Sequence, residues 1–391
     1  MEEPGPGVSR RPLVRQGLGK VISVEAYTPD AYACQVEMDG PGAAGSALAW
    51  AIAYTGLVGT PCPGDRVLLN VTAVELALGT GGVHFVICIL PSGGDDNPGT
   101  SREEIPLPGH IMKLRYLPHQ CAVAAAEDVH RPYRSIAEGE EDLDGAPVVC
   151  CELHSQVAAV AAGFLARMPA ARVIYVMTPG AALPLSFSRL SPALKAVGLL
   201  HGVITAGQCI GGDLEAINVY SAMLLAKHAL HADLVIVGQG PGNAGTGTRF
   251  GFSGIEQGDN ANAAASLGGR PIVCLRASSV DPRERHRSPS HHTLTVLDRV
   301  VRCRCVVPIA RDVPGSRRRQ ILDAMSVLRL LERHDVKDEC RGGPGVDLLV
   351  ECGVGVTTMG RTIEQDREFF LHASASGCAA ANMVEMARAG A

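Results

Sequence analysis

The sequence predicts an α/β fold in which a mainly parallel, Rossmann-like sheet is flanked by helices and preceded by a small N-terminal β-barrel-like domain. Between residues 146 and 275, short β-branched apolar runs alternate with helix-like segments, which is typical of βαβ units. Between residues 17 and 90, short β-type runs are instead split by glycine and proline turns, which is typical of a small barrel or sandwich. We therefore predict a disordered N-terminus over 1–12, a β-rich domain over 13–115 and an α/β domain over 116–391.

The individual elements follow from the same patterns. The β-type runs of the first domain are 20–26, 33–37, 48–53, 66–70 and 84–90. Residues 91–108 are rich in glycine, proline and serine and have the composition of a linker. The strands predicted for the second domain are 146–153, 172–177, 199–205, 234–237, 271–275 and 347–351. A long helix is expected to follow Asp213 and to run to Leu230, with Asp213 as a possible N-cap.

Composition excludes several classes of protein. The 391 residues carry a formal net charge of -5, which argues against a dedicated nucleic-acid binder. No apolar run reaches the roughly 18 residues of a membrane span, and the N-terminus lacks the apolar core of a signal peptide. The thirteen cysteines are scattered through apolar runs, as expected of reduced thiols in a cytoplasmic protein without disulfides or structural zinc.

The most informative stretch is a glycine-rich loop that follows the apolar run 234–237. Gly240, Gly242 and Gly245 let the backbone approach a ligand closely, and successive N–H groups in such a turn can bind an anion. Thr246 and Thr248 add hydroxyls, and Arg249 adds a planar cation suited to phosphate or carboxylate. A purely structural turn and a dinucleotide site (the segment formally matches GxGxxG) are the competing interpretations.

Polar residues that directly follow the other strands complete the predicted site. In open parallel sheets, ligands bind outside the carboxyl ends of the strands. The residues in this position are His154, Ser155, Thr178, Gln208, Asp213, Arg276, Ser278 and Ser279. Asn218, predicted to share a helix face with Glu215, could contact a ligand or the glycine-rich loop. We take His154 and Asp213 as candidate catalytic residues, and Thr178 and Asn218 as candidate ligand-binding residues.

Residues 281–319 form an unusually basic segment, with ten arginines against four acidic residues. His291 and His292 lie in it, after His286, and are further candidate acid–base residues. A metal site that uses the histidines, a phosphate clamp, a solvated basic face and a contact between subunits of a homo-oligomer are alternatives. No His/Cys spacing matches a known zinc pattern, so no metal site is predicted and no cofactor is identified.

The chain resembles an uncharacterised bacterial family of unknown function. The segments that carry the resemblance include GDRVLLN (64–70), GHIMKLRY (109–116), GGDLEAINVYSA (211–222), GQGPGNAGTGTRFGFSGIEQG (238–258) and SHHT (290–293). The resemblance implies no reaction, substrate or cofactor. Two functions therefore stay open: an enzyme acting on a small phosphate- or carboxylate-bearing metabolite or nucleotide, and a non-catalytic ligand-binding or assembly protein.

Overall fold

The computed structural model describes residues 13–39, 47–77, 82–91, 109–129 and 131–390. The predicted disordered segment 1–12 lies outside them. The chain divides into two compact units, Met1–Pro106 and Leu107–Ala391. Residues 109–115, which we expected at the end of the β-rich domain, therefore belong to the second unit.

The first unit is a closed five-stranded barrel with the order β1-β2-β3-β5-β4, which confirms the predicted barrel. Its strands are β1 (Gln16–Thr28), β2 (Ala31–Met38), β3 (Leu48–Tyr54), β4 (Arg66–Asn70) and β5 (His84–Leu90). Two single-turn helices, α1 (Thr55–Val58) and α2 (Thr72–Glu75), connect them. Alternate residues such as Cys34, Val36, Val67 and Leu69 fill the barrel interior, as the period of two in a strand requires.

The second unit is built on an eight-stranded sheet with the order β11-β10-β9-β12-β8-β13-β14-β15. Every strand pair in it is parallel, so the predicted parallel sheet is confirmed. The strands are β8 (Pro147–Cys151), β9 (Val173–Thr178), β10 (Gly202–Ala206), β11 (Leu214–Ala216), β12 (Leu234–Gln239), β13 (Arg270–Val273), β14 (Val306–Pro308) and β15 (Asp335–Lys337). A separate antiparallel pair, β6 (Ile111–Lys113) and β7 (Cys121–Val123), precedes them.

Two hydrophobic cores lie on the two faces of this sheet. Successive residues of β8 point to opposite cores, because Val149 belongs to one core and Val148 and Cys150 belong to the other. The first core is closed by α4 (Gln156–Leu165), α5 (Leu190–Ala196), α11 (Gly343–Glu351) and α12 (Arg367–Gly390). The second is closed by α6 (Val219–Leu224), α7 (Glu256–Ser266), α8 (His291–Thr295), α9 (Gly315–Val327) and α10 (Leu330–Arg333), and α3 (Arg134–Gly139) precedes β8.

The long helix predicted after Asp213 is wrong. The chain first adds the parallel edge strand β11, and α6 begins only at Val219. Asn218 is the N-cap, because its side-chain oxygen accepts hydrogen bonds from the backbone N–H groups of Tyr220 and Ser221 at 2.9 and 3.0 Å. The carboxylate of Asp213 instead accepts a hydrogen bond from the backbone N–H of Val203 at 2.8 Å.

The strand predicted over 347–351 is also wrong, because this segment is the second half of α11. A short apolar run has no periodicity that separates a buried strand from a buried helix. Pro344 lies in the first turn of α11, where its missing N–H costs nothing. That proline was the local signal for a helix start.

Candidate functional site

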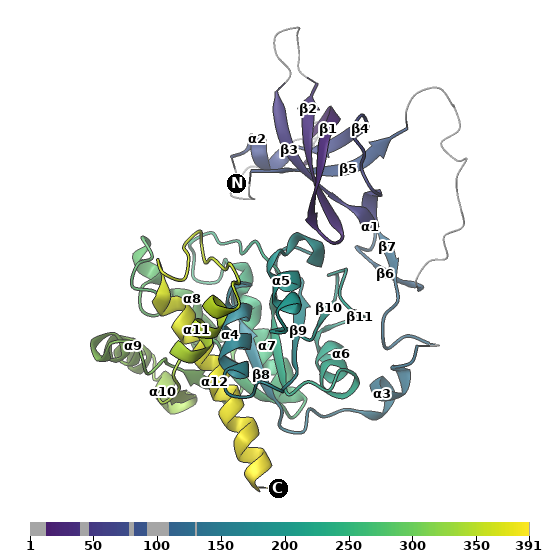
Figure 1. Cartoon of the computed structure of the whole chain (residues 1–391). Helices are drawn as coiled ribbons and strands as arrows, with labels where there is room; N and C mark the ends of the chain where they lie inside the picture. The colour runs from purple at the N-terminus through teal and green to yellow at the C-terminus, as the bar shows by residue number, and fades with distance from the viewer. Residues whose placement is uncertain (1–12, 40–46, 78–81, 92–108, 130, 391) are drawn as a thin grey trace, which may run out of the picture. The chain divides into compact units, whose positions relative to one another are not determined.

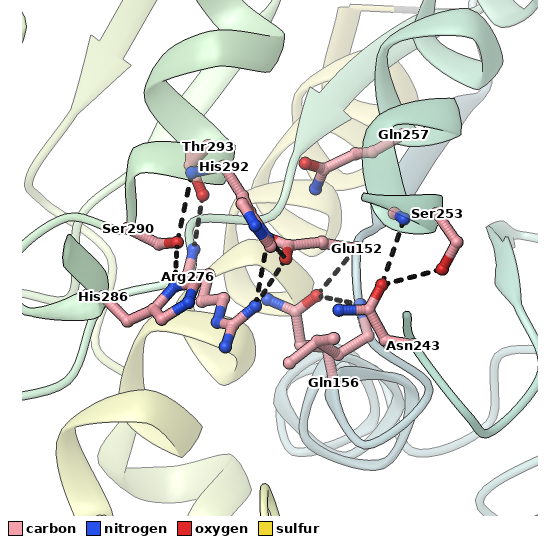
Figure 2. Close-up of polar contacts among 12 residues, drawn as sticks. Glu152, Gln156, Asn243, Ser253, Gln257, Arg276, His286, Ser290, His292 and Thr293 are labelled. Atoms are coloured by element: carbon pink, nitrogen blue, oxygen red, sulfur yellow. Dashed lines mark hydrogen bonds and ion pairs between the residues drawn. The ribbon is translucent and has the colours of Figure 1, made fainter. Parts of the chain in front are cut away.

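The carboxyl ends of three neighbouring strands, β12, β8 and β13, bring the site together. Glu152 directly follows β8, Arg276 follows β13 by three residues, and Asn243 stands in the glycine-rich loop after β12. Figure 2 shows these side chains converging with His286, from the segment that leads into α8, and with His292, from the first turn of α8. The site is therefore assembled at the edge where parallel sheets bind ligands.

Glu152 is fully buried and is the anionic centre of this group. Its Oε1 atom accepts hydrogen bonds from Arg276 Nη1 and from His292 Nδ1, each at 2.6 Å. Burial raises the pKa of Glu152, but the Arg276 guanidinium and His292 outweigh burial and bring that pKa to about 2. The carboxylate is therefore ionised at neutral pH, which requires His292 Nδ1 to carry a proton.

His292 is fixed from three sides. Its ring stacks on Phe252, with the ring centroids 3.7 Å apart and the planes 3° from parallel. Its backbone N–H donates to Ser290 Oγ at 3.2 Å, so Ser290 is the N-cap of α8. Together with the bond to Glu152, these contacts define the orientation of the imidazole.

Two further histidines lie beside His292. His286 Nδ1 is 2.8 Å from Ser290 Oγ, and the ring of His291 is centred 4.4 Å from that of His292. Burial, followed by the nearby Arg276 and Arg283, lowers the pKa of His286 to about 3. Burial and His292 lower the pKa of His291 to about 4. Both rings are neutral at physiological pH.

The glycine-rich loop closes on itself over the edge of the site. Gly245 pairs with Phe252 in an antiparallel bridge, and Thr246 N–H donates to the Gly251 carbonyl at 2.7 Å. The hydroxyls of Thr246 and Thr248 are 2.9 Å apart and lie over Gly251, where a Cβ would come within 2.2 Å of the first hydroxyl. These threonines therefore shape the loop from within.

Asn243 ties the loop to the ends of two strands. Its Oδ1 atom accepts hydrogen bonds from Gln239 Nε2 at 2.9 Å, from Ser253 Oγ at 2.9 Å and from Gly254 N–H at 3.1 Å. Gln239 Nε2 in turn donates to the Glu152 carbonyl at 2.9 Å. The loop and the buried carboxylate are thus held in one hydrogen-bonded unit.

A small cavity of about 150 Å³ lies between the loop and the basic segment. Its lining consists of Asn243, Gly245, Gly247, Arg276, Arg283, Arg285, His286, His292 and Met359. Arg276 is balanced by Glu152, and Arg283 is balanced by the buried carboxylate of Asp281 at 3.0 and 2.9 Å. Arg285 is exposed and makes no ion pair within the described part of the chain. The lining therefore carries three guanidinium groups and no carboxylate, and two of these groups pair with carboxylates that lie outside the lining.

Several residues predicted for the site lie outside the cavity lining. Arg249 is half-exposed and forms an ion pair with Asp298 at 2.8 Å. Thr178 donates a hydrogen bond to the carboxylate of Glu256, and Asp213 forms an ion pair with Lys195 at 2.5 Å. Asn218 is committed to capping α6.

His154 is also committed to interior contacts. Its Nδ1 atom is 3.2 Å from the Tyr175 hydroxyl, and its Nε2 atom is 2.7 Å from Ser188 Oγ. The Tyr175 hydroxyl lies 3.0 and 2.9 Å from the carbonyls of Gly238 and Gln239, so its proton points to them and it accepts from His154. Burial lowers the pKa of His154 to about 4, which keeps the ring neutral.

A family model matches the chain over residues 50–377, and its family is described as "Protein of unknown function (DUF3866)". The chain belongs to this family. The match covers the later part of the barrel, from within β3 through β5, and nearly all of the α/β unit, and it confirms the resemblance to an uncharacterised family. No curated protein and no solved structure matches the chain. Among the described residues, no helix is both long and apolar enough to cross a membrane.

Of the residues predicted for the site, the structure brings Gly245 and His292 to the cavity and places His291 beside it. The prediction missed Glu152 and Asn243, and it took Arg276 only as one of many polar residues after strands. Glu152 did have a signal, because it is a lone acid at the end of the apolar run Val148–Cys151. A buried charge needs a buried partner, so such an acid marks a polar network even where the partner cannot be named.

Proposed function

We propose that this protein binds a small phosphate- or carboxylate-bearing metabolite, with the anionic group in the cavity between the glycine-rich loop and Arg276, Arg283 and Arg285. The observation that carries the proposal is the cavity lining, in which three guanidinium groups and two imidazoles meet backbone that has no Cβ at Gly245 and Gly247. Guanidinium groups bind phosphate and carboxylate through paired N–H donors.

The size of the cavity supports an anionic head group as its occupant. Pockets that enclose a drug-sized ligand usually measure about 300–1,000 Å³. A cavity of about 150 Å³ is smaller than these pockets. One phosphate or carboxylate group with a few neighbouring atoms suits this volume, and the remainder of a larger ligand would extend beyond it.

The three arginines would have different roles. Arg276 is buried and held by Glu152, so its orientation is set before a ligand arrives. Arg283 is held in the same way by Asp281. Arg285 has no ion pair in the described residues and would supply the charge that a bound anion neutralises. Preorganised donors of this kind reduce the entropy that binding costs.

Substitution of Arg285 tests the proposal without opening the core. We expect Arg285→Ala to weaken the binding of inorganic phosphate about tenfold, because one charge-assisted hydrogen bond is lost. Arg285→Lys should restore only part of the affinity, because an ammonium lacks the planar fork. Isothermal titration with phosphate measures both effects, and native mass spectrometry of freshly purified protein identifies any retained ligand.

Arg249→Ala is the matched control, because Arg249 stands in the loop outside the cavity lining. Thermal melts verify that each variant is folded. Equal phosphate affinity in wild type and Arg285→Ala would overturn the proposed cavity. If Arg249→Ala alone lowered the affinity for phosphate, the anion would instead bind at Arg249, the loop arginine that the sequence suggested.

The cysteines support a reducing compartment, which we propose to be the cytoplasm. Each of the thirteen is a free thiol, and eight of them are buried. Free thiols persist where cellular reductants keep them reduced. Fractionation of cells that express the native protein would locate it.

A further inference from the structure

Three histidines at the cavity form a cluster with the composition of a metal site. His286, His291 and His292 each offer a ring nitrogen, and these atoms lie within 4.8 Å of one another. The ring centroids are 4.4–5.0 Å apart. His286 and His292 are 2% and 5% exposed, so the cluster belongs to the interior.

The hydrogen bonds of the three rings indicate which nitrogen each could offer. His292 Nδ1 is committed to the Glu152 carboxylate, and His286 Nδ1 is committed to Ser290 Oγ. Both contacts leave the Nε2 atom as the possible metal ligand. The Nε2 atom of His291 is buried and has no hydrogen-bond partner in the part of the chain that the structure describes. A buried nitrogen without a partner is costly unless something binds it.

The surroundings of the rings match those of histidine ligands. A histidine that binds a metal usually donates its other ring N–H to a carboxylate or another fixed acceptor, which orients the ring. Glu152 performs this role for His292, and Ser290 Oγ can perform it for His286. In such a site the imidazole binds the metal through one ring nitrogen and keeps a proton on the other.

We propose that His286, His291 and His292 together bind one divalent transition metal ion, with Zn²⁺ as the best fit, at the wall of the cavity. Imidazole nitrogens suit Zn²⁺, Ni²⁺ and Co²⁺ and do not suit Mg²⁺ or Ca²⁺. In a tetrahedral zinc site the nitrogens stand about 3.3 Å apart, given Zn–N bonds of about 2.0–2.1 Å. One ring nitrogen of each histidine already lies within 4.8 Å of the others, and rotation of the His286 and His291 side chains would bring their Nε2 atoms to that of His292.

Three histidine ligands leave the fourth position of a tetrahedral ion open. Because His286 and His292 line the cavity, that position would face its interior. An oxygen of the bound anion or a water molecule would occupy it. This step rests on the proposed function, whereas metal binding itself does not.

The charges around the cluster should couple the binding of the metal to the binding of phosphate. Arg276 and Arg285 stand near the histidines and repel a cation, and they are offset in part by Glu152. A bound phosphate would neutralise more of this charge. Metal and phosphate should therefore strengthen each other's binding by the same factor, as thermodynamic linkage requires.

The test uses the full chain after chelator treatment and dialysis. Zn²⁺ is titrated calorimetrically without phosphate, and Co²⁺ is titrated with visible absorption as a report of tetrahedral nitrogen ligation. We expect one ion per chain. His291→Ala should weaken binding at least tenfold, whereas His110→Ala should leave it unchanged, because His110 is a surface residue with a side chain that is 68% exposed.

His291→Gln serves as a second variant in case the alanine variant melts early, because glutamine keeps the polar volume. Absence of stoichiometric metal binding by the wild-type chain would overturn the metal site. So would equal affinity in the His291 and His110 variants. Phosphate titrated in the absence of metal is a separate arm: if it binds while Zn²⁺ does not, the proposed function survives and the metal site fails.

Discussion

Glu256 is a half-buried side chain at the start of α7. The effect of its carboxyl group on the free energy of unfolding depends on pH. Its carboxylate accepts a hydrogen bond from the Thr178 hydroxyl. Burial raises the pKa of Glu256, the Thr178 hydrogen bond opposes this, and the result is a pKa of about 7. The ordinary value for this side chain in an unfolded chain is about 4.5.

Between pH 4.5 and 7 the folded state binds more protons at Glu256 than the unfolded state, so the free energy of unfolding falls as the pH rises through that window. The shift corresponds to at most about 3 kcal/mol. Glu256→Gln should therefore be more stable than wild type at pH 8 and should lose this pH dependence, as urea unfolding at pH 5 and pH 8 would measure.

The exposed Glu138 provides the control, because a surface carboxylate paired with Arg134 contributes little to stability. Glu138→Gln should unfold with the same pH dependence as wild type. If Glu256→Gln were no more stable than wild type at pH 8, the carboxyl would be paying no burial cost and the proposed titration would be wrong.

At the same scale, Glu152 shows why much of the site was beyond sequence reasoning. Its partner His292 is 140 residues away along the chain. Local pattern identified the glycine-rich loop and the histidine pair, because glycine clusters and histidines carry their own signals. It could not identify which acid would meet which base, because that depends on how three strands are ordered in the sheet.

Among the secondary-structure elements, α4, α11 and α12 cross at glycines. A Cβ on Gly163 of α4 would come within 2.1 Å of the Ser374 carbonyl oxygen in α12. A Cβ on Gly377 of α12 would come within 2.0 Å of the Val160 carbonyl oxygen in α4, and Gly345 of α11 lies against Gly163. The atoms in the way belong to the backbone, so the helices themselves would have to move apart.

Alanine at Gly163 or Gly377 should therefore be strongly destabilising. Overpacking of a filled core costs about 1–3 kcal/mol, and a clash with backbone belongs at the upper end of this range or above it. Gly315→Ala in α9 is the matched control, because a Cβ there has no heavy atom within 4 Å. Chemical denaturation should show a clearly lower free energy of unfolding for Gly163→Ala, and an unchanged or slightly higher one for Gly315→Ala. Equal stability of the two variants would contradict the close crossing.

The hydrophobic periodicity of the sequence predicted some of these strands and helices and failed for others. The five central strands of the α/β unit were found because each is a buried, β-branched run bounded by turns. The predicted helix after Asp213 failed because β11 is only three residues long, which is too short to show any period. The segment 347–351 failed because one turn of a buried helix and one buried strand have the same composition.

For the molecule as a whole, the barrel and the α/β unit have separate hydrophobic cores. The barrel core contains Val21 and Leu69, whereas both cores of the sheet lie after residue 107. The family model begins inside β3 and ends inside α12, so it includes parts of both units. The family model therefore includes only the later strands of the barrel, from within β3 to β5, and no described cavity-lining residue comes from the barrel.

The last prediction follows from this separation. A domain with its own core can fold alone, and every residue that lines the cavity lies between Asn243 and Met359. A chain of residues 107–391 should therefore be soluble and melt cooperatively. Its affinity for inorganic phosphate should lie within about twofold of that of the full chain, which is a difference of about 0.4 kcal/mol in binding free energy. Isothermal titration of the full chain and the shortened chain in one buffer, with Arg285→Ala in both, measures this directly. A shortened chain that melts like a folded protein but loses phosphate binding would mean that the barrel completes the ligand site. If the full and the shortened chain bind phosphate equally well, and Arg285→Ala weakens binding by the same factor in both, the barrel takes no part in binding the anion.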